Sequence, residues 1–296
     1  MLRRLLVFGG VGLIVLFGLR LFSNSLEPEA TGSAPPNPIP VVAPAYDCAA
    51  NSPTPQLFID DWTKEYAAET YNVTIIDLVE NCTYSFGDAS ATFPTASTGK
   101  VIVATGVLER VAAGTLDYAE VAADMKLMIT QSDNSAADRL FKIIGRNDAV
   151  NSIATRFGLT QTTTGGAWGT IMTSSADQAL LLNQVVGLQK SPLPEAQRVV
   201  LRELMTSINP EQAWGAGHGT PAGWLAAVKN GWYLSVDGDR PPVGKWRVNT
   251  LGFVWDSKSQ PRWIFTGYSN TWETQERGIS AWNAVSEQLA TTIGTR

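Results

Sequence analysis

The chain has little of what metal chemistry and histidine-based catalysis require. It contains one histidine, His218, and two cysteines, Cys48 and Cys82, among 296 residues. These cannot form a zinc site at the usual ligand spacings, and we expect neither a metal nor a cofactor. No serine lies within a G-x-S-x-G sequence, so a Ser–His–Asp hydrolase that uses His218 is kept only as an alternative.

Clusters of basic residues are also missing. The formal net charge is −5, and no run of lysines or arginines occurs, which argues against a nucleic-acid surface. The composition, 44% hydrophobic and 17% charged, is that of a globular protein with a sizeable core. We find no internal repeat, and we expect a monomer.

The N-terminus carries a positive charge followed by an apolar run. Arg3 and Arg4 precede residues 5–19, a stretch near the short limit for crossing a bilayer. No A-x-A site follows, so for residues 1–25 we favour an uncleaved signal anchor over a cleaved signal peptide. A twin-arginine export signal is a further alternative. Each predicts a body outside the cytoplasm, either attached to the membrane by this segment or secreted.

A tether and a folded domain follow. Residues 26–55 are rich in proline and alanine and predict a semi-extended linker, and the domain covers 56–296. Cys48 at the end of the linker and Cys82 suit an oxidising compartment, so we predict a disulfide between them. Two unlinked thiols are the alternative.

Hydrophobic spacing predicts an α+β fold. Helices are expected at 56–71, 99–113, 119–130, 135–144, 148–157, 174–187, 194–207 and 277–292, and strands at 72–78, 82–86, 226–233, 246–255 and 261–268. Because strands occur at both ends of the domain, we expect one antiparallel sheet built from both ends of the chain. Flanking helices and an inserted all-helical subdomain complete the predicted architecture.

Three short motifs carry the chemistry. They are Ser97-Thr98-Gly99-Lys100, Ser132-Asp133-Asn134 and Lys229-Asn230-Gly231. A serine needs a neighbouring base, and Lys100 lies within reach of Ser97 at a predicted helix start. A lysine can serve as that base if burial or a nearby cation, such as Lys229, lowers its pKa. Ser97 as a simple helix N-cap is the alternative.

The other two motifs also have ordinary structural explanations. The Ser132 motif is typical of a helix N-cap, and Lys229 could be a solvated residue on an exposed strand. A phosphate-binding loop at Lys100 is excluded, because Pro94 stands where its first glycine would be and Val101 follows the lysine. The fixed order of the three motifs is what favours a catalytic site.

On these motifs, the chain resembles the class A β-lactamases and related penicillin-recognising serine enzymes from about residue 56 to residue 296. Segments 106–111 and 127–140 also look like that family. The resemblance implies a β-lactam or a peptidoglycan stem peptide as substrate. It implies the following roles: nucleophile Ser97, base Lys100, proton transfer by Ser132, and substrate contacts by Asn134, Lys229, Gly231 and the backbone N–H of Trp232.

The chain also departs from the family pattern. Only residues 101–131 separate Lys100 from Ser132, so a loop of the cleft wall is missing. The segment 165–170, which corresponds to the family's Ω-loop, lacks the glutamate that activates the deacylating water. In the third motif, Asn230 replaces the family's usual threonine or serine. Trp232 stands after Gly231, where the family usually has a small residue. We therefore expect a compact variant that forms an acyl-enzyme and deacylates slowly.

Two other functions remain open at this point. Without the glutamate, the chain could act as a D-alanyl-D-alanine carboxypeptidase-like enzyme of the cell wall. It could also be a non-catalytic binding module of the cell envelope, since a fold alone does not guarantee chemistry. The four intact residues Ser97, Lys100, Ser132 and Lys229 favour an enzyme.

Overall fold

The computed structural model describes residues 54–66, 70–187, 189–240 and 242–295. The predicted anchor or signal peptide at 1–25, almost all of the linker and Cys48 lie outside these residues. The side chain of Cys82 is buried, and its disulfide with Cys48 stays a prediction. Among the described helices, none is both long and apolar enough to cross a membrane.

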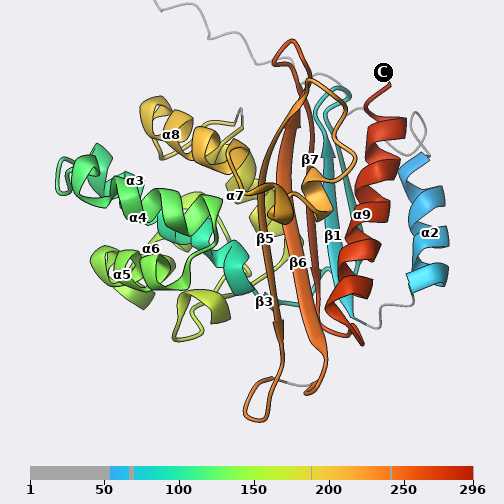
Figure 1. The fold of residues 1–296 in the computed structure, drawn as a ribbon, viewed down its shortest axis with the longest axis horizontal. Helices are drawn as coiled ribbons and strands as arrows, with labels where there is room; N and C mark the ends of the chain where they lie inside the picture. The colour runs from blue at the N-terminus through green and yellow to red at the C-terminus, as the bar shows by residue number, and fades with distance from the viewer. Residues whose placement is uncertain (1–53, 67–69, 188, 241, 296) are drawn as a thin grey trace, which may run out of the picture. The chain divides into compact units, whose positions relative to one another are not determined.

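A five-stranded antiparallel sheet lies at the centre of the fold (Figure 1), with the strand order β2-β1-β7-β6-β5. The strands are β1 (Tyr71–Asp77), β2 (Cys82–Gly87), β5 (Leu225–Leu234), β6 (Trp246–Trp255) and β7 (Pro261–Ser269). Because β1 pairs with β7, both ends of the domain contribute to one sheet, and this prediction is confirmed.

Helices lie on both sides of the sheet. On one side, α2 (Thr54–Tyr66) packs against α9 (Gln275–Thr292). The other side carries α3 (Lys100–Ala112), α4 (Tyr118–Thr130), α5 (Asn134–Ile144), α6 (Arg146–Phe157), α7 (Ser175–Val185) and α8 (Glu195–Thr206). The expected α+β class with an inserted helical subdomain is confirmed.

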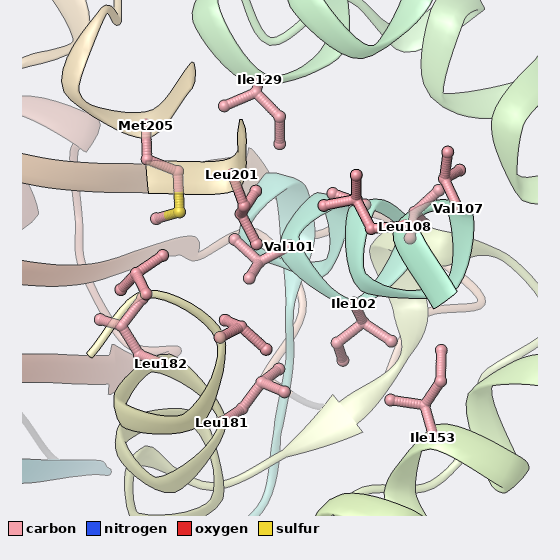
Figure 2. Packing of buried hydrophobic residues seen from close by; sticks show 14 of the residues in the cluster. Val101, Ile102, Val107, Leu108, Ile129, Ile153, Leu181, Leu182, Leu201 and Met205 are labelled. Atoms are coloured by element: carbon pink, nitrogen blue, oxygen red, sulfur yellow. The ribbon is translucent and has the colours of Figure 1, made fainter. Parts of the chain in front are cut away.

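Helix α3 forms the core of that subdomain. Every residue of Lys100–Leu108 is buried, because neighbouring helices pack around the whole circumference of this segment. Figure 2 shows Ile102 among the apolar side chains of this core. Gly106 permits a close approach, since a Cβ there would lie 3.1 Å from the side chains of Ile144 and Ile153. Dense packing on all sides fixes the position of the N-terminus of α3.

Aromatic residues fill the core on the opposite side of the sheet. The rings of Trp62 and Trp282 are stacked with centroids 5.3 Å apart, and Trp62 Nε1 donates to the Ala281 carbonyl at 2.7 Å. Trp62 and Trp263 are buried. Trp246 is only half-buried, because it lies at the first position of β6, near the end of the sheet.

A second, two-stranded ladder is a feature that the sequence did not predict. Strand β3 (Phe93–Pro94) pairs with β4 (Met172–Thr173), and two-residue strands are too short to show a period. The ladder brings the segment before Ser97 beside the loop at 165–171. Thr95 N donates to the Ile171 carbonyl at 2.8 Å at this junction.

Asn249 on β6 attaches the same segment to the sheet. Its buried side chain donates from Nδ2 to the Pro94 carbonyl at 2.8 Å and accepts at Oδ1 from Ser269 N at 3.2 Å. The amide therefore links β6, β7 and the residues that precede Ser97. Both ends of the Asn249 amide are needed, because its partners are buried and cannot bond to water instead.

We predict that Asn249→Ala lowers the free energy of unfolding by about 1–3 kcal/mol, because the Pro94 carbonyl and the Ser269 N–H lose a buried partner. Urea denaturation measures this change. The control is Asn151→Ala on the exposed side of α6, which should change the value by less than about 0.5 kcal/mol. Equal losses in the two variants would contradict the prediction.

Candidate active site

Ser97 lies in a short 3-10 turn, Ala96–Gly99, immediately before α3. The buried Thr98 Oγ1 lies 2.8 Å from the Tyr268 hydroxyl, so the turn is bound to β7. Ala96 adopts a φ of 48°, a left-handed conformation that is uncommon for alanine. Ser97 does not cap either helix, because neither helix start has a side-chain cap, so the alternative of a simple N-cap is not supported.

Lys100 joins the first two motifs. Its Nζ lies 3.1 Å from Ser97 Oγ and 3.1 Å from Ser132 Oγ. The same atom donates to the Ser132 carbonyl at 2.5 Å and to Asn134 Oδ1 at 2.8 Å. The Lys100 side chain is completely buried. The structure therefore brings together all three predicted catalytic residues, with Asn134 beside them.

The partners of Lys100 indicate how its amine is used. The carbonyl oxygens of Ser132 and Asn134 can only accept, so they occupy two N–H groups. A neutral amine then has one lone pair left for a serine hydroxyl, which is what a general base requires. Burial lowers the pKa of Lys100 to about 8, against the opposing effect of nearby carboxylates. At pH 7 about 10% of such amines are neutral, roughly 300 times the fraction of an ordinary lysine.

Lys229 on β5 is the second amine of the site. Its Nζ donates to Ser132 Oγ at 2.8 Å and to the Asn230 carbonyl at 3.2 Å. Complete burial lowers the pKa of Lys229 well below its usual value, and the charge of Lys100 lowers it further. The Ser132 hydroxyl thus lies between two amines. This arrangement can relay a proton across Ser132.

The Ser132-Asp133-Asn134 loop serves both as a helix N-cap and as part of the site around Lys100. Asp133 is the N-cap of α5, and its Oδ1 accepts from Ala136 N at 2.6 Å. Ser132 has a φ of 59°, a strained conformation for a residue with a side chain. The cap fixes the start of α5, and the left-handed turn directs both the carbonyl and the hydroxyl of Ser132 toward Lys100.

Gly231 allows β5 to lie directly against the nucleophile turn. A Cβ at this position would be 2.6 Å from Ser97 N and 2.8 Å from Thr98 N. Only glycine fits such an approach, because real Cβ atoms do not come that close to backbone atoms. The predicted role of Gly231 in the site is therefore a matter of close packing between a strand edge and the turn.

The side chains of Asn230 and Trp232 face away from that turn. Asn230 Nδ2 donates to the carbonyls of Gln212 and Trp214, each at 2.8 Å, and its Oδ1 accepts from Thr250 Oγ1 at 2.6 Å. The Trp232 ring packs edge-on against Trp214, with centroids 5.7 Å apart. Asn230 therefore stabilises a neighbouring loop. Trp232 has only its backbone N–H left to offer a substrate beside Ser97.

A tryptophan occupies the region where the sequence lacked a glutamate. The loop 165–170 places the Trp168 ring over Lys100, with its centroid 4.4 Å from Nζ. Trp168 Nε1 donates to Asp138 Oδ1 at 2.7 Å. Sequence reasoning missed Asp138. One signal could have found it, because it follows Asn134 by one helical turn and so shares its face of α5.

His218 takes no part in this cluster. It is partly exposed, and its Nε2 lies 2.7 Å from Glu287 Oε1 on α9. The structure thus offers no serine partner to it among the contacts it describes, and the Ser–His–Asp alternative is not supported. Within the described part of the chain, no group of three or more His, Cys, Asp or Glu side chains could bind a metal.

Comparisons with known proteins agree with these motifs. Residues 121–245 match the model of a family described as the β-lactamase enzyme family. A class A β-lactamase from Bacteroides cellulosilyticus has a similar structure, with 18% identity, coverage of 82% of this chain and 98% of that chain, and a TM-score of 0.68. A β-lactamase from Xanthomonas campestris pv. campestris is 20% identical, with coverage of 81% of this chain and 99% of that chain and a TM-score of 0.67. A β-lactamase from Sphaerobacter thermophilus is 14% identical, with coverage of 82% of this chain and 98% of that chain and a TM-score of 0.68.

A search of curated protein sequences finds no match. At identities of 20% or less, the structural likenesses show the fold alone. Together with the family match over the central segment, they confirm the resemblance drawn from the motifs. The roles of the individual side chains rest on the geometry described above.

We predict that Gly231→Ala lowers the free energy of unfolding by about 1–3 kcal/mol, because the added methyl group overlaps the Ser97 and Thr98 amides. Thermal and urea unfolding measure the loss. Gly169→Ala is the matched control, since its nearest contact would be 3.9 Å away, and its effect should stay within about 0.5 kcal/mol. A Gly231→Ala variant as stable as the control variant would contradict the close approach of β5.

Proposed function

We propose that this β-lactamase-like protein is an extracytoplasmic serine acyl-transfer enzyme that opens β-lactams or related peptidoglycan amides through an acyl-Ser97 intermediate. One observation carries the proposal. Lys100 Nζ lies 3.1 Å from Ser97 Oγ while the Ser132 and Asn134 carbonyl oxygens occupy two of its N–H groups. A neutral Lys100 in this position is a general base for Ser97.

Acylation then follows from the contacts of the three catalytic residues. Ser97 Oγ attacks the carbonyl carbon, and its proton passes to Lys100 Nζ. When the C–N bond breaks, the leaving nitrogen takes a proton from Ser132 Oγ, and Ser132 regains one from the protonated Lys100. The proton of Ser97 thereby reaches the leaving group without any metal-bound or water-derived acid. The backbone N–H groups of Ser97 and Trp232 are the proposed donors to the oxyanion.

Substrate recognition rests on charge and on a free amide. Lys229 Nζ, which lies beside Ser132 Oγ, is the proposed donor to a substrate carboxylate. Asn134 uses its Oδ1 on Lys100, and its Nδ2 has no partner among the described residues. Nδ2 can therefore donate to the carbonyl oxygen of a substrate amide.

Deacylation is proposed to be slow. The loop 165–170 contains no carboxylate, so no group of the loop can activate water as the glutamate of the resembled family does. This observation equally favours the second candidate, a D-alanyl-D-alanine carboxypeptidase-like enzyme with a stem-peptide substrate. The N-terminal residues 1–25 are the basis for proposing attachment to a membrane outside the cytoplasm, and we propose a monomer.

The first test is covalent labelling. The full chain is incubated with a fluorescent penicillin, and intact mass is followed over time. We expect an adduct whose mass equals that of protein plus penicillin, and we expect Ser97→Ala to reduce its formation at least about 1000-fold, because the variant lacks the hydroxyl that forms the proposed ester. Ser207→Ala, which removes a hydroxyl at the C-cap of α8, is the control and should react as the unchanged protein does.

The outcomes separate the candidate functions. A persistent adduct supports slow deacylation, and an adduct that clears with release of opened penicillin shows lactamase turnover. The absence of any Ser97-dependent adduct at high penicillin concentration would contradict the acyl-enzyme proposal and favour a non-catalytic binding module.

The pH dependence of acylation tests the base. Because the neutral amine is the active form, we predict a rate that rises about tenfold per pH unit below pH 8 and levels off above it. Stopped-flow measurement of adduct formation between pH 6 and 9.5 gives the profile. Lys126→Ala on α4, which removes an exposed amine, should leave the midpoint unchanged. A rate that is constant or falls with rising pH would exclude Lys100 as the base.

A further inference from the structure

The Trp168 ring lies over the Lys100 amine. Lys100 is completely buried although its Nζ belongs to the reactive centre, and Trp168 is only partly buried. Four oxygen contacts from Ser97, Ser132 and Asn134 lie around Nζ. The indole face supplies a further, non-polar contact at 4.4 Å. The ring cannot activate water, and it takes up space that water would need to reach the amine.

The backbone of the Trp168 loop is fixed by contacts with the nucleophile turn. The Trp168 carbonyl accepts from Thr95 Oγ1 at 3.0 Å, and a Cβ on Gly99 would lie 2.3 Å from this carbonyl. Within the loop, Thr170 Oγ1 donates to the Gly165 carbonyl at 2.7 Å. The loop is therefore in tight contact with the turn and closed upon itself.

Asp138 fixes the orientation of the indole ring. The carboxylate accepts from Trp168 Nε1 at 2.7 Å, a charge-assisted hydrogen bond. Asp138 lies one turn after Asn134 on α5, so the same helix face binds both Lys100 and the residue that covers it. A planar ring that is fixed by its edge, with one face on Nζ, has little freedom to turn away.

Building on the proposed function, we propose that Trp168, positioned by Asp138, is a cap that excludes water from the Lys100 side of acyl-Ser97. The acyl group is therefore released only to a nucleophile that enters on the side of Ser132 and Lys229, where the leaving nitrogen departed. In that release, the nucleophile bonds to the ester carbonyl carbon and the C–Oγ bond of Ser97 breaks. The proton of the nucleophile passes through Ser132 and Lys100 to Ser97 Oγ. Asp138 acts as a positioning residue in this proposal.

Trp168→Ala tests the cap by separating deacylation from acylation. We expect the lifetime of the penicilloyl adduct to shorten at least about tenfold, because water gains access to the Lys100 side. Acylation near pH 7 should not become faster, because exposure of the amine raises the pKa of Lys100. Trp168→Leu, which keeps apolar packing but is too short to cover Nζ, gives the same test if the alanine variant does not fold. An unchanged adduct lifetime in a folded variant would overturn the proposal.

Asp138→Asn distinguishes positioning from direct base catalysis. Its amide oxygen can still accept from Trp168 Nε1, so we expect the adduct lifetime to change by less than about twofold. If Asp138 were itself the base for deacylation, the same variant would lengthen the lifetime strongly, and the proposal would fail. Asp138→Ala removes the acceptor and should shorten the lifetime as Trp168→Ala does.

A second measurement is independent of acylation. Reductive methylation with formaldehyde and cyanoborohydride is followed at Lys100 and at the exposed Lys126 by peptide mass. We expect Trp168→Ala to raise the rate at Lys100 at least about fivefold relative to Lys126, because the cap over the amine is gone. An unchanged ratio would overturn the cap even if penicillin never labels Ser97. A missing penicillin adduct with a raised ratio would instead contradict only the acyl-enzyme function.

Discussion

The burial of one amine is the constraint on which the rest of the site depends. Lys100 has no exposed surface, and a lysine in that position needs polar partners and gains them from Ser97, Ser132 and Asn134. Burial lowers its pKa to about 8, which makes a base available near neutral pH. The same burial that stabilises the packing of α3 thus supplies the chemistry. Exposing this amine to water would raise the pKa of Lys100 and reduce the fraction that is neutral near pH 7.

The fold provides that environment by joining distant parts of the chain. The segment before the nucleophile turn is bound to β6 through Asn249, and the turn itself is bound to β7 through Tyr268. Strand β5 lies directly against the turn at Gly231. These strands come from the last third of the domain, whereas Ser97 comes from the first. The amines of Lys100, at the start of α3, and Lys229, on β5, both lie within hydrogen-bond distance of Ser132 Oγ. Stability and chemistry therefore share the same contacts.

The missing glutamate and the presence of Trp168 concern the same loop. A carboxylate there would serve hydrolysis, whereas an indole over Lys100 covers the amine with an apolar surface. The carboxylate of Asp138 lies nearby but is bonded to the indole edge. In the proposed mechanism, this part of the site combines an activated serine with poor access for water. Such a combination suits an enzyme whose acyl intermediate is long-lived.

The sequence by itself determined the three motifs, the α+β class and most helices and strands, because apolar spacing and motif order are local properties. It identified Ser97, Lys100, Ser132 and Lys229 as one set. Only the tertiary structure decided which side chains of β5 face the turn. Successive side chains of a strand point to opposite faces of the sheet, and the packing of neighbouring elements determines which face lies against the turn. The link from Asp138 through Trp168 to Lys100 likewise joins three elements far apart in sequence, and no local pattern encodes it.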